Sequence, residues 1–428
     1  KPMRTGIKTL ILPLLIINPF AAAWSAEAAE YTPGNFHNYS HAEGTVPKGD
    51  YQYSVYVPGD YDPKKSYPLV FWLHGGRGRD HPEKGKRNMI SDRLKDNRRF
   101  TDAGYSRNVP GYIGYILVSP VKPVLRWNAG IFARLIKHVK GKVSVDENRI
   151  YVTGFSMGGQ GTWRVGCGND GSYKIAAMMP LGAWGCREVQ RGKTKETFKT
   201  LNTAVWNLHC PQDHVSRISE QLPLFQAHLD FGGYGRFTMI PGKGHISRPR
   251  GNDHAFFGMR MAWMLSQTYG TPFNYVLKVN DGKIAKVASG KRPFTGDTSG
   301  YGFYEPGTVV NVTAPESKGD KPFVKWASAR GTFAKATSRS TTFTTPKGDV
   351  TISAIYGKNP FTLKVEGGKA EPAEPKPGEV VTVTATGNRF YFWKTDSKLL
   401  DIALPSARSF SFAMPSADVT ITAQGKYE

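Results

Sequence analysis

The segment Gly-Phe-Ser-Met-Gly at residues 154–158 constrains the fold of this chain more than any other feature of its sequence. The apolar run at residues 150–153 is typical of a buried strand, and residues 159–165 keep a helical register. A Gly-x-Ser-x-Gly motif between a strand and a helix is the nucleophile elbow of the α/β-hydrolase fold. We therefore predict an α/β domain with Ser156 as its nucleophile.

Strands and helices alternate on both sides of this motif. We expect strands at residues 51–57, 68–73, 114–120, 149–154, 174–180, 203–209 and 236–240, and helices at 129–141, 218–229 and 255–267. Such alternation builds a mostly parallel sheet through right-handed crossovers. The first strand alternates polar and apolar residues, so we predict that it is antiparallel and forms a hairpin with the second.

The acid and the base of a catalytic triad are expected downstream of the serine, in that order. Asp213 follows the strand at 203–209 and His245 follows the strand at 236–240, so both lie at the carboxyl edge of the sheet. We predict that these two residues activate Ser156. Asp213 could instead cap the next helix. Other histidines that could act as the base are His209, His214 and His254.

Backbone N–H groups must also stabilise the oxyanion that forms during acyl transfer. In this fold one donor is the residue after the nucleophile, and the other comes from a loop after an earlier strand. We therefore predict donors at Met157 and in the His74-Gly75-Gly76 loop, with Gly76 and Gly75 as the candidates. The alternative for this loop is an ordinary tight turn.

The substrate-binding candidates are Trp127 and Trp184, which follow strands, and Arg77, which opens a basic segment at residues 77–99. The two indoles could line an aromatic acyl pocket, although packing is an equal alternative. The basic segment could attract an anionic substrate or simply be a solvated loop.

Three cysteines allow at most one intramolecular disulfide. Cys186 and Cys210 follow successive strands at the same sheet edge, so they are the predicted pair, leaving Cys167 as a free thiol. The histidines show no metal-ligand spacing and three cysteines do not form a zinc set, so we expect no metal and no cofactor.

The first 29 residues have the layout of a signal peptide, which is an apolar run at 10–20 between basic residues and small residues. A membrane anchor is the alternative, but the run is short of the roughly 20 apolar residues that a span needs, and Pro13 and Pro19 interrupt it. We expect a secreted, periplasmic or cell-surface protein without a stable membrane span.

Lys and Arg outnumber Asp and Glu by 57 to 34, and the excess is spread along the chain. A basic surface favours anionic partners such as acidic polysaccharide or lipopolysaccharide. No nucleic-acid-binding pattern accompanies the charge, so nucleic acid is not an expected partner.

After Pro272 the sequence loses helical periodicity and repeats itself. Val-Leu-Lys-Val at 276–279 corresponds to Thr-Leu-Lys-Val at 362–365, and Pro-Gly-x-Val-Val recurs from 306 and from 377. Each copy also has one aromatic–Trp pair, ending at Trp326 and Trp393, where a core role is favoured over stacking on sugars. The predicted organisation is a signal peptide at 1–29, a catalytic domain at 30–271, and all-β modules at 272–358 and 359–428.

Residues 45–270 resemble a secreted esterase group that includes feruloyl and acetylxylan esterases, polyhydroxyalkanoate depolymerases and predicted peptidases. The resemblance is carried by residues 67–75, 145–163 and 263–267 and by the Asp213 and His245 loops. It implies the same triad and oxyanion donors. Two departures are His209-Cys210 where the group commonly has His-Gly, and the basic segment after the first glycines.

Each tail repeat resembles the divergent InlB B-repeat module of bacterial surface and secreted proteins, through its Pro-Gly-x-Val-Val, aromatic–Trp and Asp-Val-Thr-Ile elements. Such modules are usually spacers or adhesive units.

These features together predict a serine esterase, with feruloyl or acetyl esters on plant-type polysaccharide as the leading substrates. A polyester depolymerase is the main alternative and a serine peptidase a weaker one. A surface adhesion protein with an inactive hydrolase domain is the alternative from another class.

Overall fold

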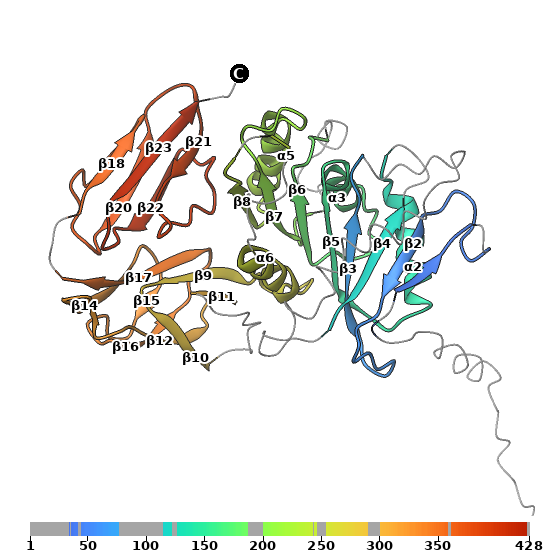
Figure 1. The fold of residues 1–428 in the computed structure, drawn as a ribbon, viewed down its shortest axis with the longest axis horizontal. Helices are drawn as coiled ribbons and strands as arrows, with labels where there is room; N and C mark the ends of the chain where they lie inside the picture. The colour runs from blue at the N-terminus through green and yellow to red at the C-terminus, as the bar shows by residue number, and fades with distance from the viewer. Residues whose placement is uncertain are drawn as a thin grey trace, which may run out of the picture.

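The computed structural model describes residues 34, 36–41, 44–76, 114–121, 126–186, 200–242, 244–245, 254–289, 300–357 and 361–425. They form an α/β domain followed by two all-β modules (Figure 1). The predicted signal peptide and the basic segment at 77–99 lie outside the described residues.

The α/β domain is built on one eight-stranded sheet. Its strands are β1 (Phe36–Tyr39), β2 (Gln52–Tyr56), β3 (Tyr67–Leu73), β4 (Ile116–Val121), β5 (Val145–Phe155), β6 (Ala177–Leu181), β7 (Ala204–His209) and β8 (Gly235–Met239). They lie in the order β1-β2-β4-β3-β5-β6-β7-β8. All pairings from β4 to β8 are parallel, whereas β1 and β2 are antiparallel to their neighbours. This confirms the predicted α/β-hydrolase fold.

The predicted hairpin between the first two apolar strands is wrong. β2 is antiparallel, as its alternation indicated, but it pairs with β4 and not with β3. Its hairpin partner is β1, which precedes it. Strand β4 lies between β2 and β3 because it pairs with both, and alternation along one strand does not specify its neighbour.

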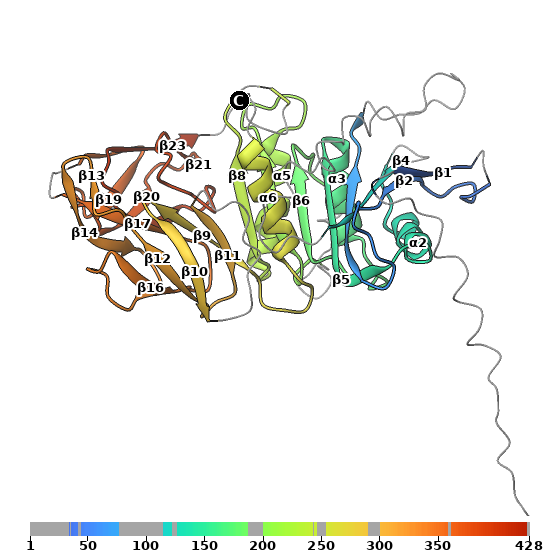
Figure 2. The same cartoon turned by 60° about the horizontal axis from the view of Figure 1, so that its bottom comes forward.

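Helices cover both faces of the sheet. The helices are α2 (Ala129–Lys140), α3 (Met157–Cys167), α5 (Ile218–Asp230) and α6 (His254–Ser266). The apolar residues of α2, α3 and α5 share one core cluster with one face of the sheet. Those of α6 pack on the opposite face together with Val276 and Phe303 of the first module. Figure 2 shows α6 beside the part of the tail that follows it.

The two tail modules share their main strand pairings. The first contains β9 (Tyr275–Asn280), β10 (Lys283–Ser289), β11 (Tyr301–Tyr304), β12 (Val309–Thr313), β13 (Ser317–Lys318), β14 (Lys321–Ser328), β15 (Thr332–Phe333), β16 (Ser340–Thr344) and β17 (Val350–Tyr356). The second contains β18 (Leu363–Glu366), β19 (Gly368–Glu371), β20 (Val380–Ala385), β21 (Phe390–Thr395), β22 (Ser409–Ala413) and β23 (Val419–Gly425). The parallel pair β9/β17 corresponds to β18/β23, and β12/β16 corresponds to β20/β22. Trp326 and Trp393 are buried in the module cores, as the repeat pattern favoured.

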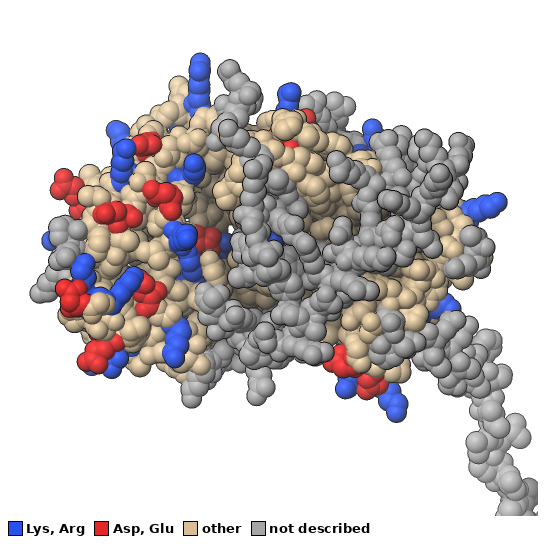
Figure 3. Space-filling view, viewed as in Figure 1, with Lys and Arg blue, Asp and Glu red and all other residues tan. Residues whose placement is uncertain are grey.

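Charges of both signs are interspersed over the tail modules on the face seen in Figure 3. Among the described residues, no helix is long and apolar enough to cross a membrane.

Arg236 of β8 joins the α/β domain to both modules. Its side chain is 3% exposed and bonds Asp349 of the first module at 2.6 Å and Asp401 of the second at 2.9 Å. The guanidinium also lies over the ring of Trp206, 4.6 Å from its centroid. Burial acts to lower the pKa of Arg236, but the two carboxylates outweigh it and hold the pKa above its ordinary value.

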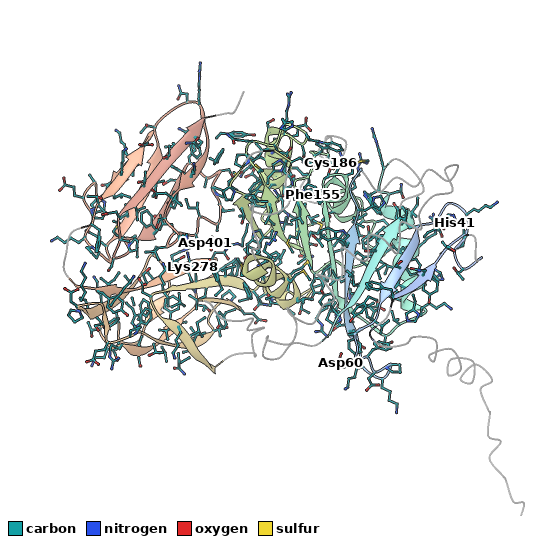
Figure 4. The ribbon with its side chains drawn as sticks, in the orientation of Figure 1. His41, Asp60, Phe155, Cys186, Lys278 and Asp401 are labelled. Atoms are coloured by element: carbon teal, nitrogen blue, oxygen red, sulfur yellow. The ribbon has the colours of Figure 1, made fainter. Side chains whose placement is uncertain are left out.

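Backbone and side-chain bonds continue this interface. The N–H of Phe237 in β8 donates to the carbonyl of Ala403 at 2.9 Å, so the second module caps the edge strand of the sheet. Lys278 and Asn280 of β9 donate to the carbonyls of Lys398 and Leu399. Figure 4 labels Lys278 and Asp401, which lie where the three domains meet. The tail is thus packed against the α/β domain.

A buried histidine in α5, His228, makes the stability of the fold depend on pH. Burial lowers the pKa of His228 from 6.5 to about 4, while its bond to the Tyr234 carbonyl acts in the opposite direction. The unfolded chain therefore binds a proton that the folded chain excludes, so stability is lost as the pH falls from 6.5 toward 4. We expect His228 to lower the free energy of unfolding by about 2 kcal/mol as the pH falls from about 7 to about 4.5. Urea unfolding of wild type and His228→Gln across this range measures it; an identical pH slope in both would contradict the assignment.

Candidate active site

Ser156 lies at a strained turn between β5 and α3. Its backbone has φ 62° and ψ −119°, a positive φ that few non-glycine residues adopt. Such a conformation costs on the order of 1–3 kcal/mol and persists where surrounding structure holds it. Here the Ser156 N–H donates to the carbonyl of Leu181 in β6 at 2.9 Å, and the Ser156 carbonyl accepts from Gln160 in α3 at 3.0 Å.

The glycines of the motif are required by close backbone contacts. A Cβ on Gly154 would lie 2.5 Å from the carbonyl oxygen of Leu73, and a Cβ on Gly158 would overlap that same oxygen. Because the obstacle is main chain and not a flexible side chain, it cannot move aside. The spacing of the motif therefore follows from the approach of α3 to the end of β3.

The glycine loop after β3 lies against Ser156, as predicted. A Cβ on Gly75 would be 3.4 Å from Ser156 Cβ and 3.9 Å from Ser156 Oγ. A Cβ on Gly76 would be 3.1 Å from the sulfur of Met157. The main chain at Gly75 thus borders Ser156 and that at Gly76 borders Met157, so both glycines lie beside the turn for which the oxyanion donors are predicted.

Asp213 and His245 are brought together at the adjacent strand ends. His245 Nδ1 is 2.6 Å from Asp213 Oδ2. The other carboxylate oxygen, Oδ1, accepts from the N–H groups of Val215 and Ser216, both at 2.9 Å. Burial acts to raise the pKa of Asp213, but these bonds outweigh it and hold the pKa below its ordinary value. The carboxylate is therefore ionised and oriented toward the imidazole.

The imidazole of His245 lies beside the elbow. The Phe155 ring, one residue before Ser156, packs on it with centroids 4.6 Å apart (Figure 4 labels Phe155). His245 Nε2 is buried and has no hydrogen-bond partner among the described residues. Since Nδ1 bonds the carboxylate, Nε2 is the nitrogen left to exchange a proton with a substrate or a nucleophile. No role for Phe155 was predicted from the sequence, although its place before the serine was a usable signal.

The alternative histidines are placed differently. His209 is fully buried and bonds the Ser216 carbonyl, and its Nε2 is 3.9 Å from Asp213 Oδ2. His214 is exposed, and the side chain of His254 lies outside the described residues. Of the described histidines, His245 is the one that bonds Asp213 at hydrogen-bond distance.

The predicted substrate-binding residues have different environments in the structure. Trp127 is 3% exposed and packs edge-on against Tyr51 and His74, which favours the packing alternative. Trp184 is half-buried, and its indole N–H donates to the carbonyl of Val215 at 2.7 Å, two residues from Asp213. Arg77 lies outside the described residues.

The predicted disulfide between Cys186 and Cys210 is not formed. All three cysteines are free and buried. The Cys186 thiol points to the carbonyl of Gln160, whereas the Cys210 thiol donates to the carbonyl of Gly242 at 3.2 Å. Successive strands place two cysteines near one edge but do not aim their side chains at each other. In the part of the chain that the structure describes, no cluster of potential metal ligands is found.

One protein-family model matches the tail. Residues 276–360 and 362–427 match the divergent InlB B-repeat domain, which confirms the resemblance of the two modules. A search of curated proteins gives no match to this chain.

Solved structures to which the chain is similar include esterases and a putative dienelactone hydrolase. A thermostable esterase is 23% identical with a TM-score of 0.40, over 55% of this chain and 63% of that chain, so less than two thirds of that esterase is spanned. A feruloyl esterase module from Clostridium thermocellum is 20% identical with a TM-score of 0.32, over 50% and 83%. A putative dienelactone hydrolase from Klebsiella pneumoniae is 14% identical with a TM-score of 0.37, over 54% and 97%.

Proposed function

We propose that this protein is a serine hydrolase of carboxylic esters with Ser156, His245 and Asp213 as its triad. The observation that carries the proposal is the 2.6 Å bond between Asp213 and His245 beside a serine held at positive φ. Acyl transfer by serine uses an imidazole oriented by a carboxylate as its general base, and the strained turn of a nucleophile elbow exposes the serine hydroxyl.

In the proposed mechanism His245 Nε2 takes the proton of Ser156 Oγ as this oxygen attacks the ester carbonyl carbon. The negative charge moves to the carbonyl oxygen, facing the N–H groups of Met157 and Gly76 or Gly75. Collapse of this intermediate expels the alcohol, which takes the proton from His245. Water then attacks the acyl carbon while His245 takes its proton; the bond from that carbon to Ser156 Oγ breaks, Oγ takes the proton from His245, and the acid leaves.

For the substrate we propose an ester on plant-type polysaccharide, with a feruloyl or acetyl group. Support comes from the apolar surface beside the Asp213 turn, where Val215 is 47% exposed and Trp184 is half-buried. Such a surface suits an aromatic acyl group. With the predicted signal peptide, we expect the protein to act outside the cytoplasm.

The test is hydrolysis of p-nitrophenyl acetate by the purified protein, with Ser156→Ala as the matched control. We expect turnover by wild type and none above background in the variant. No turnover by folded wild type would favour the adhesion alternative. Methyl ferulate against emulsified polyhydroxybutyrate then separates the substrate classes; cleavage of the polyester alone would overturn the polysaccharide assignment.

A further inference from the structure

His209 contacts both segments that carry the acid and the base of the proposed triad. It is the last residue of β7 and is fully buried. Its side chain donates from Nε2 to the Ser216 carbonyl at 2.6 Å, across the turn that holds Asp213. Its main-chain carbonyl accepts from the N–H of Ile240 at 2.7 Å, at the end of β8 and ahead of His245.

Ser216 connects His209 to the Asp213 carboxylate through two hydrogen bonds. Its N–H donates to Asp213 Oδ1 at 2.9 Å while its carbonyl is held by His209. With Oδ1 also occupied by the N–H of Val215, Oδ2 is the oxygen that faces His245. If the bond from His209 were lost, Ser216 would be free to move, and the orientation of the carboxylate would loosen with it.

The protonation state of His209 suits this role. Burial is the largest influence on its pKa and lowers it, so the imidazole is neutral near pH 7. Since Nε2 donates to a carbonyl, Nδ1 carries the lone pair of the neutral ring. The Ser216 carbonyl, the charge of Asp213 and the Gln221 side chain act to raise the pKa of His209, but burial outweighs them. A neutral ring also does not compete with His245 for the charge of Asp213, 3.9 Å away.

We propose that His209 is a positioning residue that closes the Asp213 turn and thereby fixes the carboxylate against His245. The inference rests on the proposed function, because it gives His209 a role in the same triad. It differs from a packing role in requiring an N–H donor at the position of Nε2.

Two amide variants test this requirement. Glutamine is long enough to place its amide N–H near the position of Nε2, whereas asparagine is one methylene shorter and cannot reach Ser216. A displacement of about 1 Å in a catalytic group can cost about 100-fold in rate, so we expect His209→Asn to lower kcat by about that factor with KM nearly unchanged. His209→Gln should retain most of the wild-type kcat. His214→Asn, an exposed histidine of the same turn, is the control.

A second readout does not depend on activity. The proton of the short His245–Asp213 bond should give a strongly deshielded N–H signal in one-dimensional proton NMR, assigned by its loss in His245→Gln. We expect the signal to persist in His209→Gln and to broaden or disappear in His209→Asn. Equal effects of the two amides, or wild-type kcat and signal in His209→Asn, would overturn the proposal. Wild type with the signal but no esterase activity would instead refute the proposed function and leave His209 to be judged by the NMR pair.

Discussion

Asp213→Asn is expected to lower kcat on p-nitrophenyl acetate by about 10⁴-fold with little change in KM. The substitution keeps the volume of the side chain and its place in the turn, but an amide can donate to Nδ1 and so stabilise the wrong tautomer of His245. The carboxylate that would stabilise the imidazolium is also lost. We expect the effect on the chemical step, because Asp213 is only 4% exposed and its Oδ2 bonds His245, which leaves it no surface for substrate binding.

Steady-state kinetics of Asp213→Asn measure this loss, and Ser156→Ala gives the rate without the proposed nucleophile. Asp170→Asn, an exposed aspartate on the loop after α3, is the matched control and should keep the wild-type kcat. Retention of more than about a tenth of the wild-type kcat by Asp213→Asn would contradict the role of Asp213, since a triad carboxylate contributes far more than that.

Arg236→Ala is expected to lower the free energy of unfolding by about 3–5 kcal/mol, because removing one member of a buried ion-pair network leaves uncompensated charge. The side chain of Asp349 is only 9% exposed and would lose its cationic partner. Asp349 also accepts from the Tyr234 hydroxyl and the Val276 N–H, so these contacts would be weakened as well. The loss should therefore affect the contact of both modules with β8.

Urea unfolding of wild type and Arg236→Ala measures this change. Arg134→Ala is the control, because the Arg134–Asp50 pair has the same residue types but Arg134 is 56% exposed. We expect less than about 1 kcal/mol from that exposed pair. Equal losses of unfolding free energy in the two variants would contradict the interdomain role of Arg236. So would tail unfolding in Arg236→Ala at the same urea concentration as in wild type.

The elbow could be predicted from the sequence because its glycines and serine are fixed by local geometry. The main chain of Leu73 leaves no room for a Cβ at Gly154 or Gly158, so glycine is required at both positions and the motif is visible in the sequence. The meeting of Asp213 and His245 could be predicted, because parallel strands end at one edge, where loop residues converge. The helices of the domain were predicted well, since their apolar faces repeat at the helical period.

Features that depend on contacts between distant segments could not be predicted. The insertion of β4 between β2 and β3 is decided by pairing across the sheet, and the directions of the Cys186 and Cys210 thiols by neighbouring carbonyls. Arg236 appears in the sequence as one basic residue among many. Its two partners lie 113 and 165 residues further along the chain, and no periodic pattern connects them.

The most direct test of the proposed catalytic serine is covalent labelling of the native protein with diisopropyl fluorophosphate, followed by peptide mapping. Only a serine activated by an oriented base reacts rapidly with such a reagent. We predict a single adduct, on Ser156, that is absent from Ser156→Ala and forms much more slowly in Asp213→Asn. An adduct on another residue, or none on a protein that hydrolyses p-nitrophenyl acetate, would contradict the proposed triad.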